Sequence, residues 1–203
     1  DIGMTTLIKI FIILFLFSCN LVPEIQSLSN TSSSSLEKAI KESNDINNKV
    51  ILRYGYFNYS VFSKRSVDDE IWSNNSNISF EICRYKICFF KQDSNELIFE
   101  NPISINEIIE NKKDFYKTYV RFNNPESGTL IYISKFKIIR EGQMKGFLDN
   151  KNYSYILLEE NFSVPKIRWK GVNFYYIDSD DFELISLTQS VSPFRKNVTL
   201  YKK

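Results

Sequence analysis

The stretch Asn173-Phe174-Tyr175-Tyr176-Ile177-Asp178-Ser179-Asp180-Asp181 decides the fold class of this chain. Its first half is rich in aromatic and β-branched residues, which favour a β-strand. Its acidic end, from Asp178 to Asp181, is typical of a hairpin turn, and a second strand-like segment follows over residues 182–190. Together these features predict an antiparallel hairpin.

The same composition recurs along the chain in short segments separated by turn residues. Strand-like segments occupy residues 50–62, 70–72, 78–90, 96–100, 116–122, 129–134, 137–140, 153–159, 166–169 and 197–202. Many short strands joined by turns predict a mainly β fold, either an antiparallel sandwich or a partly open barrel. Helical spacing adds one or two short helices, over residues 35–43 and, from the capping-box pattern Ser104-Ile105-Asn106-Glu107, over residues 104–114.

A different signal lies near the N-terminus, at Leu16-Phe17-Ser18-Cys19. It closes an apolar run of about 11 residues, which is shorter than the roughly 20 residues of a membrane-spanning helix but suits a signal-peptide core. The pattern resembles the lipobox of bacterial lipoproteins, in which the cysteine becomes the first mature residue and carries a diacylglycerol. We therefore predict lipidation of Cys19, with palmitate among its acyl chains. An ordinary secretory signal, cleaved without lipid attachment, is the alternative.

The predicted organisation is a signal peptide over residues 1–18, a flexible tether over residues 19–35 and a single β-rich domain over residues 36–203. The tether is rich in serine and buries little surface. By analogy with enterobacterial sorting, Asn20 indicates the outer membrane, because it is not an aspartate. We expect a lipid-anchored protein at the outer membrane, on the periplasmic face in preference to the cell surface.

Composition argues against several classes of function. The chain contains no histidine, which removes Ser-His-Asp and Cys-His catalysis and histidine metal sites. Its net charge is only +2, so nucleic acid is not an expected partner. Its glycines are too dispersed for a phosphate-binding loop. We expect a protein that is not an enzyme, with no catalytic residues, no metal and no cofactor.

Two cysteines remain when Cys19 is assigned to a lipid anchor. Cys83 and Cys88 lie five positions apart, and in a continuous strand their Cα atoms would be roughly 16 Å apart, beyond disulfide reach. A disulfide requires a tight hairpin turn over residues 84–86. Two buried thiols in one strand are the alternative, and the sequence does not choose between them.

Acidic residues of the C-terminal part could be offered as ligands or catalytic groups. A glycosidase needs two carboxylates, and a calcium site needs several. The candidates for a catalytic pair are Glu159, Glu160, Asp178 and Asp181, and those for a calcium site are Asp178, Asp180 and Asp181. Any choice of a catalytic pair is arbitrary, and the turn lacks the glycine of an EF-hand. We interpret these residues as solvated charges.

Aromatic residues gather in the same part of the chain, at Trp169, Phe174, Tyr175 and Tyr176. With Arg168 and Lys170 beside them, they could form a sugar-binding platform, or alternate members could face the core. Strand alternation places Tyr175 on one face and Phe174 and Tyr176 on the other, so only one set can form a platform. Core packing is the favoured interpretation.

The order of motifs in this region resembles a known family. A stretch from Glu159 to Trp169 runs into Asn173-Phe174-Tyr175-Tyr176-Ile177-Asp178, then Ser190-Val191-Ser192-Pro193-Phe194 and Val198-Thr199-Leu200-Tyr201-Lys202. This is similar to the C-terminal region of the YjbF/GfcB-like lipoproteins, the group-four capsule polysaccharide lipoprotein family. That family has a Trp-containing stretch, Asn-x-Tyr-Trp-Val-Asp, a Ser-x-Gln segment, a proline and a final strand. Here Tyr176 replaces the family's tryptophan, and Thr188-Gln189-Ser190 only approximates Ser-x-Gln.

The resemblance implies a β-rich lipoprotein that supports capsule or exopolysaccharide production and export without a catalytic mechanism. It would act by binding the polysaccharide or an outer-membrane export protein. The family-like positions are Trp169, Asn173, Tyr175 and Asp178, and we expect them to be structural. The alternative function is a surface-displayed lipoprotein that binds a host or environmental ligand.

Overall fold

The computed structural model describes residues 49–54, 58–64, 71–74, 77–111, 113, 115–123, 126–193 and 197–203. All of them belong to a unit that spans residues 39–203. The predicted signal peptide, Cys19, the predicted tether and the helix predicted over residues 35–43 all lie outside the described residues. Within the described ranges, no helix has the length and apolar character needed to cross a bilayer.

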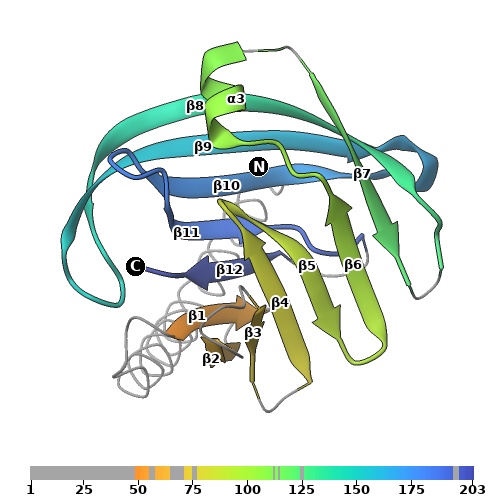
Figure 1. The fold of residues 1–203 in the computed structure, drawn as a ribbon, viewed down its shortest axis with the longest axis horizontal. Helices are drawn as coiled ribbons and strands as arrows, with labels where there is room; N and C mark the ends of the chain where they lie inside the picture. The colour runs from red at the N-terminus through yellow and green to blue at the C-terminus, as the bar shows by residue number, and fades with distance from the viewer. Residues whose placement is uncertain are drawn as a thin grey trace, which may run out of the picture. The chain divides into compact units, whose positions relative to one another are not determined.

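Twelve antiparallel strands form one hydrogen-bonded ring in the described part of the chain (Figure 1). Each strand pairs with its neighbours in sequence, and β1 pairs with β12, so the ring is an up-and-down barrel. The strands are β1 (Lys49–Tyr54), β2 (Asn58–Lys64), β3 (Ile71–Ser73), β4 (Ile78–Cys83), β5 (Lys86–Gln92), β6 (Asn95–Glu100), β7 (Tyr116–Phe122), β8 (Leu130–Lys145), β9 (Asn152–Val164), β10 (Trp169–Asp178), β11 (Leu184–Gln189) and β12 (Val198–Tyr201). The predicted mainly β, antiparallel fold is confirmed.

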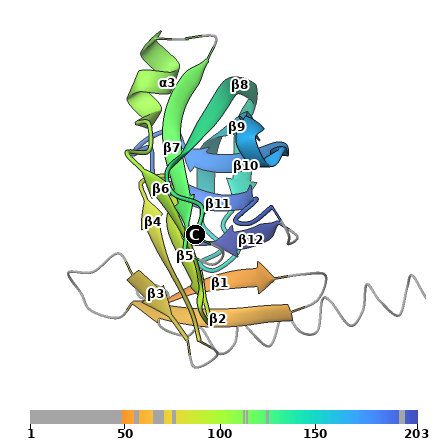
Figure 2. The same ribbon diagram turned by 90° about the vertical axis from the view of Figure 1, so that its right-hand side faces the viewer.

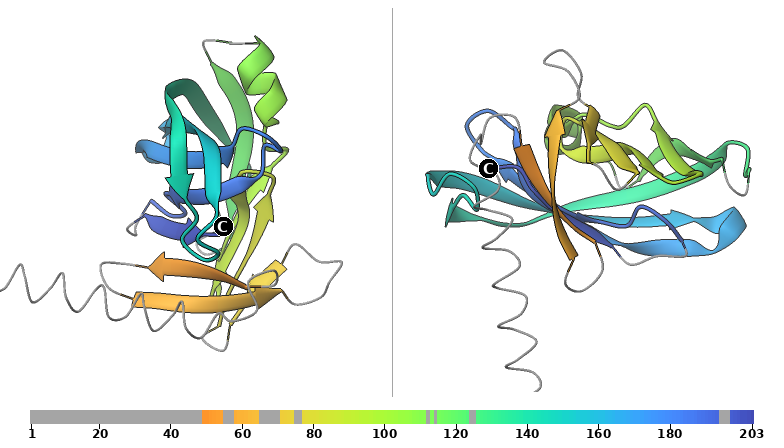
Figure 3. Two further views of the ribbon diagram at one scale, coloured as in Figure 1. Left: turned by 90° about the vertical axis from the view of Figure 1, so that its left-hand side faces the viewer. Right: turned by 90° about the horizontal axis from the view of Figure 1, so that it is seen from below.

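The ring is flattened into two walls whose strands cross steeply. Strands β8 to β12 run across the view of Figure 1, while β4 to β7 run up and down in front of them. Figure 2 shows the same two walls edge-on, with β1 and β2 lying across one end. The view from below in Figure 3 shows β1 and β2 spanning from one wall to the other. Strong strand twist produces this shape, and side chains from both walls fill the interior.

The core follows from strand alternation. In β7, Tyr116, Thr118 and Val120 are buried while Lys117 and Tyr119 are exposed. The same period of two along the other strands sends large aromatic side chains inward. Their rings meet edge-to-face across the interior, with centroids 5.0 Å apart for Phe62 and Phe80, 5.0 Å for Phe99 and Tyr132, and 5.1 Å for Tyr85 and Tyr175.

A single α-helix, α3 (Ile105–Asn111), connects β6 to β7 in the described part of the chain. Its start is the predicted one, because the Ser104 hydroxyl accepts a hydrogen bond of 3.1 Å from the Glu107 backbone N–H. Ile105 and Ile108 lie on the buried face of the helix and join the core. The helix prediction is confirmed, although the helix ends before the expected residue 114.

Three strand predictions are wrong in detail. The segment predicted over residues 50–62 forms two antiparallel strands, β1 and β2, in place of one bent strand. Residues 129–134 and 137–140 belong to one strand, β8, because Lys135 and Phe136 continue the alternation between them. The segment predicted as a strand over residues 166–169 instead begins in a 3-10 helix, η2 (Pro165–Ile167), and Arg168 adopts a φ of 54°. Pro165 has no N–H for a strand ladder, so the chain turns there and β10 starts at Trp169.

The β8–β9 hairpin extends beyond the barrel and folds back over the end of β12. The Phe147 N–H donates to the Lys203 carbonyl at 2.8 Å, and the Phe147 and Tyr201 rings lie 4.5 Å apart. A second apolar cluster forms outside the barrel, where Tyr155, Leu157 and Ile185 are buried with Met144, Tyr153, Phe174 and Tyr176 against them.

Candidate functional site

The turn of the β4–β5 hairpin directs two of its side chains into the barrel interior. Cys83 and Cys88 form a disulfide across this hairpin, with Cα atoms 5.6 Å apart. Of the two alternatives, the tight turn with a disulfide is therefore correct, and the continuous strand with two thiols is not. Arg84 adopts a φ of 64° at the turn and points to solvent. The next two residues, Tyr85 and Lys86, are only 1% and 4% exposed. The turn therefore delivers an aromatic ring and a charge to the core.

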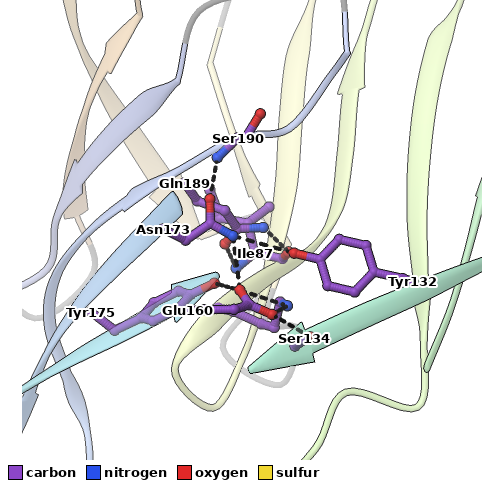
Figure 4. Close-up of polar contacts among 9 residues, drawn as sticks. Ile87, Tyr132, Ser134, Glu160, Asn173, Tyr175, Gln189 and Ser190 are labelled. Carbon is purple, nitrogen blue, oxygen red and sulfur yellow. Dashed lines mark hydrogen bonds and ion pairs between the residues drawn. The ribbon is translucent and has the colours of Figure 1, made fainter. Parts of the chain in front are cut away.

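Lys86 meets the carboxylate of Glu160, which lies on β9 and is fully buried. The Lys86 ammonium lies 3.2 and 3.4 Å from the two carboxylate oxygens. The Ser134 hydroxyl donates to Oε1 at 2.8 Å, while the Asn173 amide at 2.8 Å and the Tyr175 hydroxyl at 2.5 Å donate to Oε2 (Figure 4). Both carboxylate oxygens are thus fully engaged.

This group, which we call the Glu160 cluster, reaches further across the barrel. The Asn173 carbonyl oxygen accepts a 2.8 Å bond from the Ser190 N–H (Figure 4). The Gln189 amide bonds both the N–H and the carbonyl of Ile87 at 2.9 Å, as a neighbouring strand would. Residues of β5, β8, β9, β10 and β11 are therefore fastened to one another inside the barrel.

The charges of the cluster are stabilised by their surroundings. Burial by itself would raise the pKa of Glu160, but the Lys86 charge and the bonds from Tyr175, Asn173 and Ser134 outweigh it and hold that pKa below its ordinary value. Burial, with the Glu160 charge added to it, raises the pKa of each neighbouring tyrosine well above 10: Tyr85, Tyr132 and Tyr175. At neutral pH the cluster holds an ionised carboxylate and neutral phenols.

The arrangement suits a structural role. The Glu160 side chain has no exposed surface, and every donor that faces it comes from the barrel itself. A carboxylate of this kind cannot approach a substrate, whereas general acid–base catalysis needs direct or water-mediated contact. The hydroxyl of Tyr85 is buried too, and it has no hydrogen-bond partner within the described ranges.

All four family-like residues are buried, and three of them lie in or next to the Glu160 cluster. Asn173 and Tyr175 bond Glu160 directly, and the Trp169 indole N–H donates to the Ser190 hydroxyl at 3.2 Å. Asp178 lies apart from them. Its carboxylate binds the Lys203 ammonium at 3.1 Å, in a group that also includes Asp181 at 3.0 Å from that ammonium.

The interpretation of the acidic residues as solvated is wrong for Glu160 and Asp178, which are 0% and 5% exposed. The sequence contained a signal for the burial of Glu160, because Glu160 lies at the same alternate positions of β9 as Leu158, Phe162 and Val164, which face inward. Asp178 and Asp181, offered above as calcium ligands, contact a lysine. The Glu81, Cys83 and Cys88 group has suitable spacing for a metal among the described residues, but both sulfurs are in the disulfide.

The aromatic residues considered as a sugar platform do not form one. Trp169 and Tyr175 are buried in the core, and Phe174 and Tyr176 are half-buried against the outer apolar cluster. Core packing is thus the correct interpretation for the inward pair, and the alternation of Tyr175 against Phe174 and Tyr176 is as expected.

A polar cleft of about 570 Å³ opens at the surface between three turns of the chain. The cleft is lined by Arg84 from the β4–β5 turn, Asn106 from the first turn of α3 and Lys202 after β12. The β10–β11 turn contributes Asp181, Phe182 and Glu183. We refer to this site as the polar cleft. It is a solvent-facing counterpart to the sealed Glu160 cluster, and its volume lies in the range of small-molecule sites.

No family model matches the sequence, and no curated protein matches it either. Among solved structures, the fold is similar to the crystal structure of the hypothetical lipoprotein YmcC from Escherichia coli K12, with a TM-score of 0.63 and 13% sequence identity. The similarity covers 80% of this chain and 87% of YmcC. At this identity the likeness concerns the fold, and it agrees with the fold that the family resemblance implied.

Proposed function

We propose that this chain is a non-enzymatic lipoprotein, anchored at the outer membrane through Cys19, that supports production or export of a capsule or exopolysaccharide. The observation that carries the proposal is the likeness in fold to a hypothetical lipoprotein over 80% of the chain. The lipobox-like stretch that ends at Cys19 and the C-terminal motifs from Trp169 to Asp178 support it from the sequence. The periplasmic face is the proposed side of the membrane.

A binding role suits the chemistry of the described residues. The best-connected carboxylate, Glu160, is sealed in the core, while the polar groups that face solvent line an open cleft. Such a protein would hold the polysaccharide, or an outer-membrane export protein, without changing covalent bonds.

Deletion of the gene tests the function. The surface polysaccharide of intact cells is measured by extraction and uronic-acid or neutral-sugar assay, and we expect it to fall in the deletion strain and to recover on complementation. An unchanged amount would sink the proposal. Protease treatment of intact cells tests the orientation, since digestion of the chain would instead favour a surface-displayed lipoprotein that binds an external ligand.

Cys19→Ser tests the anchor. Cells fed an alkyne analogue of palmitate should label the wild-type chain, and the variant should lose the label and move from the membrane to the soluble fraction. Cys83→Ser is the matched control, because that cysteine is assigned to the disulfide. Equal labelling of wild type and Cys19→Ser would refute lipidation at this residue.

A further inference from the structure

Two residues that line the polar cleft occupy backbone conformations that their side chains disfavour. Seven non-glycine residues in the described part of the chain have positive φ, and four of them are Asn or Asp, which tolerate it. Of the other three, Arg84 at 64° and Phe182 at 57° both line the cleft. They come from the turns of two different hairpins, so one local motif does not explain both. Unfavourable backbone at neighbouring positions is a feature of functional sites.

Phe182 has no evident role in the fold that requires an aromatic ring. Its backbone N–H closes the β10–β11 turn by donating to the Asp178 carbonyl at 3.0 Å, which any residue except proline could do. The side chain is 39% exposed and lies among polar groups. Glycine or asparagine would suit the conformation better. The ring therefore fits a role in contact with a ligand.

Arg84 supplies a charge that is not used within the fold. The acidic residues of the cleft already have lysine partners, since Asp181 lies 3.0 Å from Lys203 and Glu183 lies 3.6 Å from Lys202. Arg84 makes no hydrogen bond or ion pair with any residue that the structure describes. The adjacent disulfide fixes the turn that presents it. The cleft thus offers a guanidinium that is carried on a fixed turn, has no ion-pair partner among the described residues and suits a carboxylate.

We propose that the polar cleft binds carboxylate-bearing sugar units of an acidic polysaccharide. A pyranose ring has an apolar C–H face, which would lie on Phe182, and its carboxylate would pair with the Arg84 guanidinium through two hydrogen bonds. The Asn106 amide lines the same cleft and can exchange hydrogen bonds with sugar hydroxyls. This inference rests on the proposed function and names the ligand class of its binding site.

Binding of a defined oligosaccharide to the full chain in detergent micelles tests the inference. Trigalacturonate is the acidic probe and maltotriose the neutral one, and calorimetry or NMR titration measures the dissociation constants. We expect trigalacturonate to bind at least tenfold more tightly than maltotriose. Arg84→Asn and Phe182→Asn should each weaken trigalacturonate binding at least tenfold, while their melting temperatures stay equal to that of wild type or rise.

Asp93→Asn is the matched control, because Asp93 has a φ of 56° in the turn between β5 and β6 and does not line the cleft. It should bind trigalacturonate like wild type. Absence of trigalacturonate binding, equal affinity for maltotriose, or full affinity in the Arg84 and Phe182 variants would each overturn the inference. Binding to phosphatidylglycerol vesicles that depends on Arg84 but not on Phe182, without trigalacturonate binding, would overturn it in favour of a lipid headgroup.

A complementation experiment separates this inference from the proposed function. If the deletion strain loses surface polysaccharide and Arg84→Asn restores it fully, the cleft inference fails and the proposed function stands. If deletion leaves the polysaccharide unchanged, the proposed function fails whatever the calorimetry shows.

Discussion

Replacement of Glu160 by glutamine should destabilise the barrel strongly, because it removes the charge that balances a buried lysine. Glu160 is fully buried, Lys86 is 4% exposed, and their closest atoms are 3.2 Å apart. Glutamine has nearly the same shape, so the change creates no cavity. It leaves the Lys86 ammonium without a counter-ion. It also turns one of the two acceptor oxygens into a donor, where the carboxylate accepts from Ser134 on one oxygen and from Asn173 and Tyr175 on the other.

The magnitude follows from the burial of both partners. Loss of one member of a buried ion pair costs about 3–5 kcal/mol. A domain of this kind has a total stability of about 5–15 kcal/mol, so the change should remove roughly a fifth of it or more. For roughly 165 residues, 1 kcal/mol corresponds to about 2–4 °C, which predicts a fall in melting temperature of about 6–20 °C. Replacing Lys86 and Glu160 together by methionine should cost less than either single change.

Urea unfolding followed by circular dichroism measures the free energy of unfolding of each variant. The control is Lys91→Met, which breaks the partly exposed Lys91–Glu96 pair with its 2.6 Å separation and should cost at most about 1 kcal/mol. If Glu160→Gln costs no more than Lys91→Met, the reasoning is refuted.

The same variant should alter the response to acid. The folded pKa of Glu160 lies below its ordinary value of 4.5, so the stabilisation is complete above that value and is lost as the pH falls through the folded pKa. Glu160→Gln should lack this component, and its stability should depend less on pH in that window. A pH dependence identical to that of wild type would contradict the assignment.

Three further predictions concern the same part of the molecule. Reduction of the Cys83–Cys88 disulfide should cost about 2 kcal/mol, as expected for so short a loop, and melting curves with and without reductant would show no shift if this is wrong. Tyr85→Phe removes a buried hydroxyl that has no partner within the described ranges, so it should not destabilise the fold. Tyr175→Phe loses the hydrogen bond to Glu160 and should cost about 1.5–3 kcal/mol. Urea unfolding that ranks the two variants the other way would contradict the assigned contacts. The contribution of Tyr85, Tyr132 and Tyr175 to stability should be complete below pH 10 and should fall above it, because the unfolded chain ionises these tyrosines while their folded pKa is raised. Absorbance at 295 nm should show that they ionise only on unfolding, and their ionisation in the folded protein would refute the assignment.

Local features of the fold were predictable because local chemistry determines them. The acidic turn after Asp178 forms the β10–β11 hairpin, and Ser104 caps the helix that its spacing predicted. The predicted segments 129–134 and 137–140 are parts of one longer strand, β8, which continues through Lys135 and Phe136. Pro165 was the local signal that a turn, and not a strand, begins just before residue 166.

Closure of the ring and the Glu160 cluster were not predictable, because they depend on pairing between distant parts of the chain. Ile51 pairs with Tyr201 in the ladder that joins β1 to β12. Lys86 and Glu160 are 74 positions apart in the sequence, and each residue type considered by itself is expected at the surface. Alternation in β9 indicates that Glu160 faces inward, but it does not identify the partner that makes this tolerable.

The closed ring has a consequence for the way in which copies of this chain meet one another. An open sheet presents bare N–H and C=O groups along its outermost strands, and neighbouring copies can add strands to them and aggregate. Here the first and last strands satisfy each other, so most of that hazard is removed. Among the described residues, the shortest strand is β3, and it pairs with β2 only through Ser63–Ser73 and Lys64–Trp72. Any tendency of crowded copies to exchange strands should therefore begin at this seam of the barrel.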